Sequence, residues 1–333
     1  MKAYRLEITD KDGKTPLDGE GNPIGPFDTR NTFGAGLQLE FDVLMAGYDE
    51  VSAGTSIALY GIPISMIKQS ANLAGCEVNL YAGFWDGLPL ANPKQFGLII
   101  HGVISRPFGN WMGTHQSLNF IVNPTASADK GQEKPITIDG KAGEPFSDVL
   151  RRALKNSFPN FKIEISISDK LVTNEDPRGV YDRIAALAAS MRSQSYHVMN
   201  NEKYSGVQMV MQNKTILVFD NTGGKGGAIQ ILPHELIGQP TWIEFNTVSF
   251  KCPLRSDLRA GDTVKLPVDI TSGPGQLLAV SDGRSNSATR AGMTFSGEFQ
   301  IKSVRHVGDY LSADNSNSWV TIYEALPILA DKK

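Results

Sequence analysis

The stretch Ala74-Gly75-Cys76-Glu77-Val78-Asn79-Leu80 has a counterpart later in the chain, Ala260-Gly261-Asp262-Thr263-Val264-Lys265-Leu266. In each, two small residues precede a segment in which apolar and polar side chains alternate. This period of two is typical of a strand with one buried face. Further along, Gly102 and Gly297 each lie inside a predicted strand. The echo predicts an internal duplication, with loops of unequal length in its two copies. The candidate structural turn residues are therefore Ala74, Gly75, Ala260, Gly261, Gly102 and Gly297.

The sequence around both of these turns predicts β-strands. Working outward from the first turn, the expected strands are 4–8, 37–43, 56–60, 77–82, 96–105 and 116–122, with a short helix at 65–72. Around the second turn they are 207–211, 215–219, 242–252, 263–267, 276–279, 294–303 and 319–324. Two polar segments, 9–36 and 281–292, are expected to be long loops because Asp, Gly, Ser, Asn and Pro are frequent in them.

The middle of the chain has a different pattern. A short strand at 135–138 is followed by helical spacing over 146–154, strict alternation over 161–167 and an Ala- and Leu-rich helical pattern over 180–191. We therefore predict a mainly β protein with an α+β insert. Two antiparallel β-barrel domains, residues 1–128 and 204–333, flank a small α+β domain at 129–203.

Composition excludes several classes of protein. The 333 residues carry 32 Lys and Arg against 35 Asp and Glu, a net charge of −3, which is unlike a protein that coats nucleic acid. Cys76 and Cys252 are too few for a disulfide scaffold and are expected to be reduced, buried thiols. No apolar run approaches the roughly 20 residues that span a bilayer, so we expect no membrane insertion and folding in a reducing cytosol.

The sequence lacks a convincing catalytic set. His234-Glu235 begins a zinc-protease motif, but Gly238 replaces the second histidine. The Gly-rich run 223–227 lacks the Ser or Thr of a phosphate loop. The five histidines show no metal-ligand spacing, and Asp148 and Asp169 are better explained as helix caps than as an acid pair. We expect no enzyme activity, no cofactor and no metal.

One segment carries a recognisable pattern. A strand at 57–60 leads to a helical turn at 65–72, the Ala74-Gly75 turn, a strand ending in Ala82-Gly83-Phe84, and later Gly102-Val103-Ile104. This order resembles the first barrel of bacteriophage baseplate and tail hub proteins. The linker Gly61-Ile62-Pro63-Ile64-Ser65 departs from the usual Asn-Leu-Ser-like sequence of that family. The second barrel and the 146–167 insert are also similar to the family.

The resemblance implies an assembly. Three copies of two tube-like barrels would form a pseudo-sixfold ring that joins a sixfold tail tube to a threefold central spike. DNA would pass through the bore without specific binding. Other expected partners are distal tail proteins and baseplate components, with loops 9–36 and 281–292 as docking arms. The protein would then be a structural component of a virion tail, assembled in the host bacterial cytoplasm.

Two rival functions remain open. A glycan-binding or cell-wall-binding tail-tip module would use exposed aromatic side chains, for which Trp85, Trp111, Trp242 and Trp319 are the candidates. A peptidase or cell-wall hydrolase is the other, although its motifs are incomplete.

Overall fold

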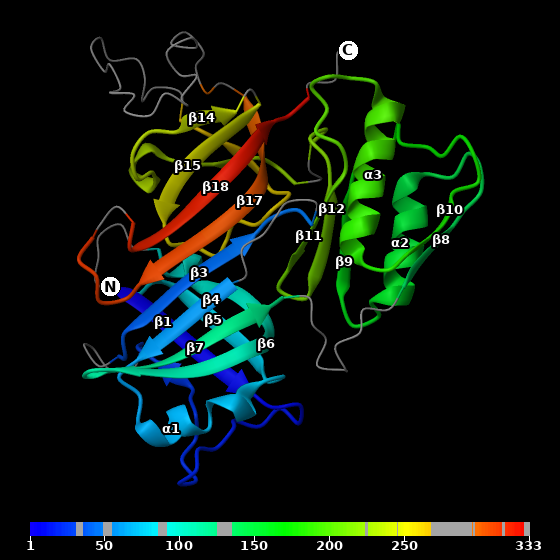
Figure 1. Cartoon of the computed structure of the whole chain (residues 1–333). Coiled ribbons are helices and arrows are strands. Elements are labelled where there is room, and N and C mark those ends of the chain that lie inside the picture. The colour runs from blue at the N-terminus through cyan, green and yellow to red at the C-terminus, as the bar shows by residue number, and fades with distance from the viewer. Residues whose placement is uncertain are drawn as a thin grey trace, which may run out of the picture.

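The structure is a computed structural model. It describes residues 1–30, 36–48, 55–85, 92–124, 135–223, 226–244, 246–267, 295, 297–314 and 317–329. Two sheet-rich halves lie one above the other in Figure 1, and a helix-containing unit lies beside them. The predicted strand 276–279 and the proposed arm 281–292 lie outside the described residues.

The described residues of the first half contain seven strands. These are β1 (Lys2–Thr9), β2 (Phe27–Asp28), β3 (Leu39–Met45), β4 (Thr55–Tyr60), β5 (Glu77–Phe84), β6 (Gly97–Met112) and β7 (His115–Asn123). The helices are α1 (Ile64–Lys68) and two short 3-10 turns, η1 (Ser70–Leu73) and η2 (Pro93–Gln95). Of the predicted loop 9–36, residues 9–30 pack on this half, because β2 pairs with β1 and Ile24 is buried in the core.

The described residues of the second half contain six strands. These are β13 (Ile229–Gln230), β14 (Thr241–Glu244), β15 (Thr247–Pro253), β16 (Thr263–Lys265), β17 (Glu298–Asp309) and β18 (Trp319–Pro327), with the 3-10 turn η3 (Pro233–Glu235). The single strand predicted over 242–252 is a hairpin, β14 and β15, with Asn246 at its turn.

The two halves repeat one strand order. In the first half the hydrogen-bonded order is β5-β6-β7-β4-β3, and in the second it is β16-β17-β18-β15-β14. All of these pairs are antiparallel. The mainly β fold class that the sequence predicted is confirmed.

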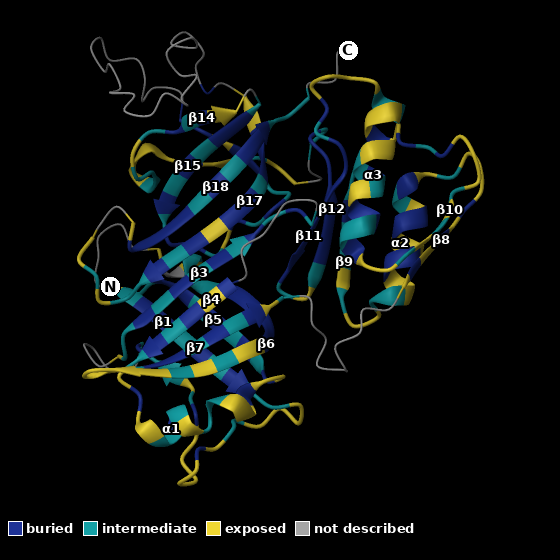
Figure 2. Cartoon of the chain, in the orientation of Figure 1, coloured by how far each residue is buried: buried dark blue, intermediate teal, exposed yellow. Residues whose placement is uncertain are grey.

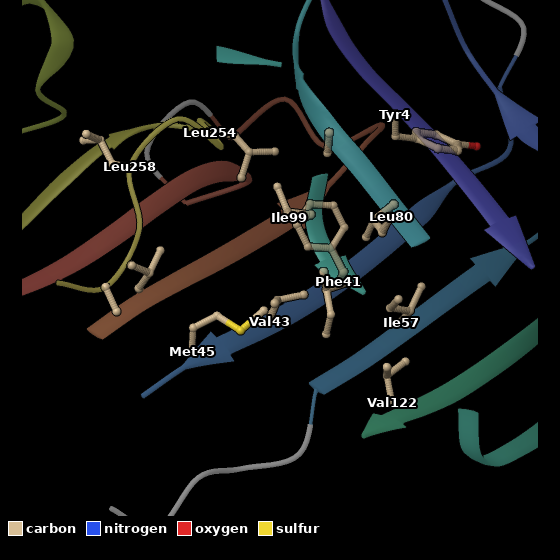
Figure 3. Close-up of a cluster of buried hydrophobic side chains, with 14 of the residues drawn as sticks. Tyr4, Phe41, Val43, Met45, Ile57, Leu80, Ile99, Val122, Leu254 and Leu258 are labelled. Atoms are coloured by element: carbon tan, nitrogen blue, oxygen red, sulfur yellow. The ribbon is translucent and has the colours of Figure 1, made fainter. Parts of the chain in front are cut away.

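One contact joins the halves into a single sheet. β17 pairs with β16 through its first residues and with β3 through Val304–Asp309, so that thirteen strands of the described chain are continuous. Apolar side chains of both halves form one core, in which Phe41, Val43 and Met45 of β3 lie near Leu254 and Leu258 (Figure 3). Burial of this core is the main stabilising contribution to the fold.

The middle unit has its own core. It contains β8 (Ile136–Asp139), α2 (Phe146–Ser157), β9 (Lys162–Ser166), β10 (Arg178–Tyr181), α3 (Ile184–Met199), β11 (Gln208–Gln212) and β12 (Thr215–Phe219). α2 presents Phe146, Val149, Leu150, Ala153 and Leu154 to that core, as the helical spacing predicted.

Two details of the middle unit differ from the prediction. Val180 lies in β10, and the second helix begins later, at Ile184, because the extended backbone of β10 pairs with β8 first. The hairpin of β11 and β12 joins β9 in a three-stranded sheet rather than the large sheet. We therefore propose that the boundary expected after residue 203 falls after Phe219.

Candidate functional site

The two predicted turns occupy equivalent places in the two halves. Gly75 has φ of +84° and Gly261 has φ of +85°, values that favour glycine. The N–H of Gly75 donates to the carbonyl oxygen of Ile104 at 2.8 Å, and the N–H of Gly261 donates to that of Ile301 at the same distance. A register shift follows each isoleucine, before Arg106 and before Ser303. Ile104 therefore corresponds to Ile301.

The other predicted turn residues are less alike. Ala74 is exposed, whereas Ala260 is buried and its N–H donates to Gln212 of the middle unit. Gly102 lies inside β6, where a Cβ would approach Val122 Cγ1 to 2.6 Å. Gly297 precedes β17 instead of lying within it. Gly102 lies two residues before Ile104, and Phe299 lies two residues before Ile301. The counterpart of Gly102 is therefore Phe299 and not Gly297.

β3 of the first half pairs with β17 of the second half, so that this edge of β17 is covered. We call this pairing the closed junction. The Phe41 ring lies against Gly308, at which a Cβ would come within 2.1 Å of the ring, and contacts Trp319 edge-on at 5.3 Å between ring centroids. On the outer face the Arg305 guanidinium donates to both carboxylate oxygens of Asp42, at 2.9 and 2.5 Å. This bidentate bond raises the pKa of Arg305. The junction thus has an apolar inner face and a charged outer face.

The matching part of the first half is open. β6 pairs with β5 only as far as Val103, and among the described strands its continuation, residues 105–112, pairs with β7 alone. Phe108, Trp111 and Met112 are exposed by 49%, 60% and 68%. Figure 2 shows this end of β6 as largely exposed, in contrast to β17 and β18. We call residues 105–112 the open edge of β6.

β14 supplies a second open edge. It is the terminal strand of the large sheet and pairs only with β15 among the described strands. Its counterpart β3 has strands on both sides, β4 and β17. Ile243 of β14 is 41% exposed. Among the described strands, β6 therefore lacks the neighbour that β3 provides for β17, and β14 lacks the neighbour that β17 provides for β3.

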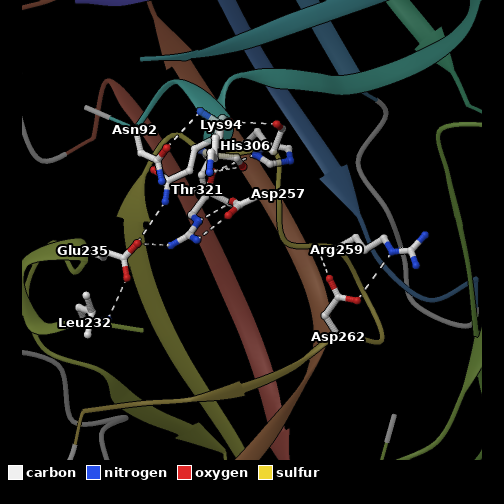
Figure 4. A network of polar contacts seen from close by, with 12 residues as sticks. Asn92, Lys94, Leu232, Glu235, Asp257, Arg259, Asp262, His306 and Thr321 are labelled. Atoms are coloured by element: carbon white, nitrogen blue, oxygen red, sulfur yellow. Dashed lines mark hydrogen bonds and ion pairs between the residues drawn. The ribbon is translucent and has the colours of Figure 1, made fainter. Parts of the chain in front are cut away.

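A buried polar network supports the second half (Figure 4). The Arg255 side chain is only 4% exposed and donates to Glu235 at 3.1 Å and to both oxygens of Asp257 at 2.7 Å. Glu235, which the sequence placed in half of a zinc motif, is therefore part of an ion-pair network. Nearby, burial raises the pKa of the Cys252 thiol to about 12, which makes this thiol unreactive.

His306 is buried within the closed junction. Its Nδ1 lies 2.9 Å from the Thr321 hydroxyl oxygen, and burial lowers the pKa of the imidazole to about 3. The ring is therefore neutral at physiological pH. The first half has Gly109 at the equivalent position of β6, where a Cβ would come within 2.3 Å of Ile67 Cγ2.

Other candidate chemistry is sparse. Across the described ranges, no three His, Cys, Asp or Glu side chains are grouped so that they could hold a metal ion. None of the described helices has the length and apolar character needed to cross a bilayer. Of the four tryptophans, Trp242 and Trp319 are buried, Trp85 packs against Phe96, and Trp111 is the most exposed.

The duplicated strand order, the shared sheet and the inserted α+β unit define a tail-hub-like fold, as the resemblance implied. No family model matches the sequence, and no curated protein matches it. Solved structures do.

The E. coli c3393 protein aligns over 97% of this chain and 77% of its own, with 11% identity and a TM-score of 0.50. It is described as a component of the type VI secretion system with structural similarity to the T4 bacteriophage tail proteins gp27 and gp5. A half-lidded Francisella PdpA–VgrG complex aligns over 100% of this chain and 59% of the other, at 8% identity and a TM-score of 0.50. These likenesses confirm the fold.

Sequence reasoning found the turns but missed the two open edges. The signal for the first was present: after Ser105 the mostly apolar stretch 98–104 has ended, and Arg106-Pro107-Phe108-Gly109 places a proline and an aromatic residue in a strand. Proline within a sheet is typical of edge strands.

Proposed function

We propose that this protein is a non-enzymatic structural hub of a phage tail or a related device, and that three copies form a pseudo-sixfold ring. The observation that carries the proposal is the match between the closed junction and the two open edges. β17 is covered by β3 of the other half, whereas its counterpart β6 has an open edge. A strand equivalent to β3 exists in the same chain, β14, and it also has an open edge.

The register makes this match specific. Asp42 pairs with Ser56, and Thr241 pairs with Ser249. Ser56 and Ser249 are counterparts, because their next neighbours across the sheet, Ile121 and Glu324, pair with the first residues after the two register shifts, Arg106 and Ser303. Thr241 is therefore the counterpart of Asp42. Asp42 faces Val307 across the closed junction, and Asn110 is the counterpart of Val307. Between two copies, Thr241 of one should therefore face Asn110 of the next.

Strand pairing of this kind suits a closed ring. An open strand edge is an aggregation hazard, and a ring removes it by giving every edge a partner. Three copies supply six similar halves, which would match a sixfold tail tube on one side and a threefold spike on the other. The neighbours support these partners, since one is described as similar to tail proteins and another is a chain of a PdpA–VgrG complex.

In this proposal DNA passes through the bore without being held. The net charge of −3 favours a weak interaction with phosphates. The protein would be part of the virion tail after assembly in the bacterial cytoplasm, in contact with tube, spike and baseplate components.

Mass photometry and negative-stain imaging of the purified chain test the assembly. We expect particles of three chain masses, each a ring with a central opening. A protein that stays monomeric at its highest soluble concentration would refute the proposal.

A disulfide experiment tests the register. Thr241→Cys combined with Asn110→Cys should give covalent trimers on a non-reducing gel. Asp42→Cys with Val307→Cys is the matched reference, which should form a bond within one chain. Thr241→Cys with Val180→Cys is the negative control, since Val180 is 71% exposed on the middle unit. The native thiols do not interfere because both are buried.

A further inference from the structure

The three-stranded sheet of the middle unit has an unpaired edge, at β9. The strand order is β11-β12-β9, and β9 runs parallel to β12. The N–H of Lys162 donates to the carbonyl oxygen of Lys214, and the N–H of Asp220 donates to that of Ser166. In a parallel ladder alternate residues bond the same neighbour, so the N–H and C=O groups of Ile163 and Ile165 point away from β12. No backbone group of the described chain bonds them.

The opposite edge of the same sheet is occupied. The N–H of Tyr48, which follows β3, donates to the carbonyl oxygen of Met209 in β11 at 3.0 Å. That bond attaches the middle unit to the large sheet. At the edge of β11 one backbone group thus has a partner outside the sheet, whereas at the edge of β9 no backbone group of the described chain bonds Ile163 or Ile165.

A cavity of about 530 Å³ runs along β9. Its walls are residues 163–166, part of β12, residues 259–263 of the second half, Ile229 and Arg151 of α2. This volume is within the range of sites that bind ligands, about 300–1,000 Å³. The cavity thus lies beside a strand that can accept another strand.

The charges of this cavity favour one kind of ligand. Arg259 is neutralised, because it bonds Glu164 at 2.7 Å and lies 3.7 Å from Asp262. Arg151 is exposed and forms no ion pair with the residues that the structure describes. An extended segment that lies along β9 would meet Arg151 as an unpaired cation, which favours a carboxylate at that point.

We propose that the edge of β9 binds an extended, acidic segment of a partner protein, which adds as a fourth strand and places a carboxylate on Arg151. Backbone hydrogen bonds to Ile163 and Ile165 supply the affinity, and the cavity selects the side chains. A second copy of this chain is a poorer occupant, since antiparallel pairing about the strand centre sets Glu164 beside Glu164. This binding site goes beyond the proposed ring and does not depend on it.

The experiment uses an array of eight-residue peptides in which Val and Thr alternate and one Asp is moved through each position. The full-length chain is the probe, and fluorescence anisotropy measures the peptides that bind. Ile163→Pro removes the outward N–H and keeps the ladder to β12, which uses Lys162, Glu164 and Ser166, although it also replaces a side chain that packs on the core of the middle unit. We expect it to weaken binding by at least about tenfold, the effect of about 1.4 kcal/mol. Ile163→Val keeps the N–H and should bind like the original chain.

Arg151→Gln tests the charge. It should weaken the Asp peptide by about tenfold and leave the matching Asn peptide unchanged. Hydrogen exchange of the 161–167 segment should slow when the peptide is added, and this measurement stands even if Ile163→Pro does not fold.

The proposal is overturned if no array peptide binds, if a folded Ile163→Pro variant binds as well as Ile163→Val, or if exchange in 161–167 is unchanged. An equal loss for the Asp and Asn peptides overturns the carboxylate contact. The mass of the assembled particle should be unaffected by Ile163→Pro, so failure of this site and failure of the ring are separate results.

Discussion

β17 and β6 occupy the same place in the two halves of the molecule, yet one is enclosed and the other is open. From Val304 onward β17 lies between β18 and β3, and Val304 and His306 are buried. The corresponding part of β6 has β7 on one side only and exposes Phe108 and Met112. The difference teaches that each half is incomplete alone, and that the chain completes only one of its two junctions by itself.

The largest expected effect comes from breaking the closed junction. Phe41→Ala removes a buried ring that packs on Gly308 and Trp319, and should cost about 3–5 kcal/mol of unfolding free energy. Guanidinium unfolding measures it. The matched control is Phe108→Ala on the open edge, which should change the stability of the single chain by about 0.5 kcal/mol or less. Equal losses would show that the two edges are equivalent.

The next effect concerns the Arg255 network of the second half, since no Arg or Lys is buried among the described residues of the first half. Arg255→Met leaves Glu235 and Asp257 without their buried cation, and should cost about 3 kcal/mol. Arg305→Met removes an ion pair from the exposed face of the closed junction and should cost less than about 1 kcal/mol. Thermal and denaturant unfolding of both variants, side by side, measures the contrast. A loss for Arg305→Met as large as that for Arg255→Met would contradict it.

The third effect depends on pH. The pKa of His306 falls from 6.5 to about 3 on folding, so the unfolded chain binds a proton that the folded chain excludes. This contribution to stability is complete above pH 6.5 and decreases by about 1.4 kcal/mol for each pH unit between 6.5 and about 3. Unfolding free energies at several pH values should show this slope. His306→Asn should remove it, and a slope unchanged by the substitution would refute the assignment.

The smallest effect compares the two turns. Gly75→Ala forces a side chain into a positive φ and should cost about 1–2 kcal/mol. Gly261→Ala should cost more, because its Cβ would also approach Phe219 of the middle unit to 3.1 Å, whereas Gly75 has open space. Denaturant midpoints of the two variants measure the difference. A larger loss at Gly75 would contradict the equivalence of the turns.

The sequence predicted the periodic elements well and the non-local ones poorly. Alternation located β1, β3, β5 and β9 within a few residues, because each has one buried face. It could not extend the strand predicted to end at residue 303 as far as Asp309, since the partner that stabilises that part of β17 is β3, far away in the chain. The two turns were visible as small-residue pairs. The open edges were not visible in the sequence, because an open edge depends on which distant strands pair, and local alternation does not show this.

The pairing of β3 with β17 also has a consequence for synthesis. Residues 40–45 emerge from the ribosome long before residues 304–309 that cover them. Throughout that interval β3 has an exposed edge that can pair with the wrong strand, and closure of so long a loop is slow. During synthesis the first half therefore folds with the edge of β3 still unpaired. Truncated or stalled chains should aggregate where full-length chains do not.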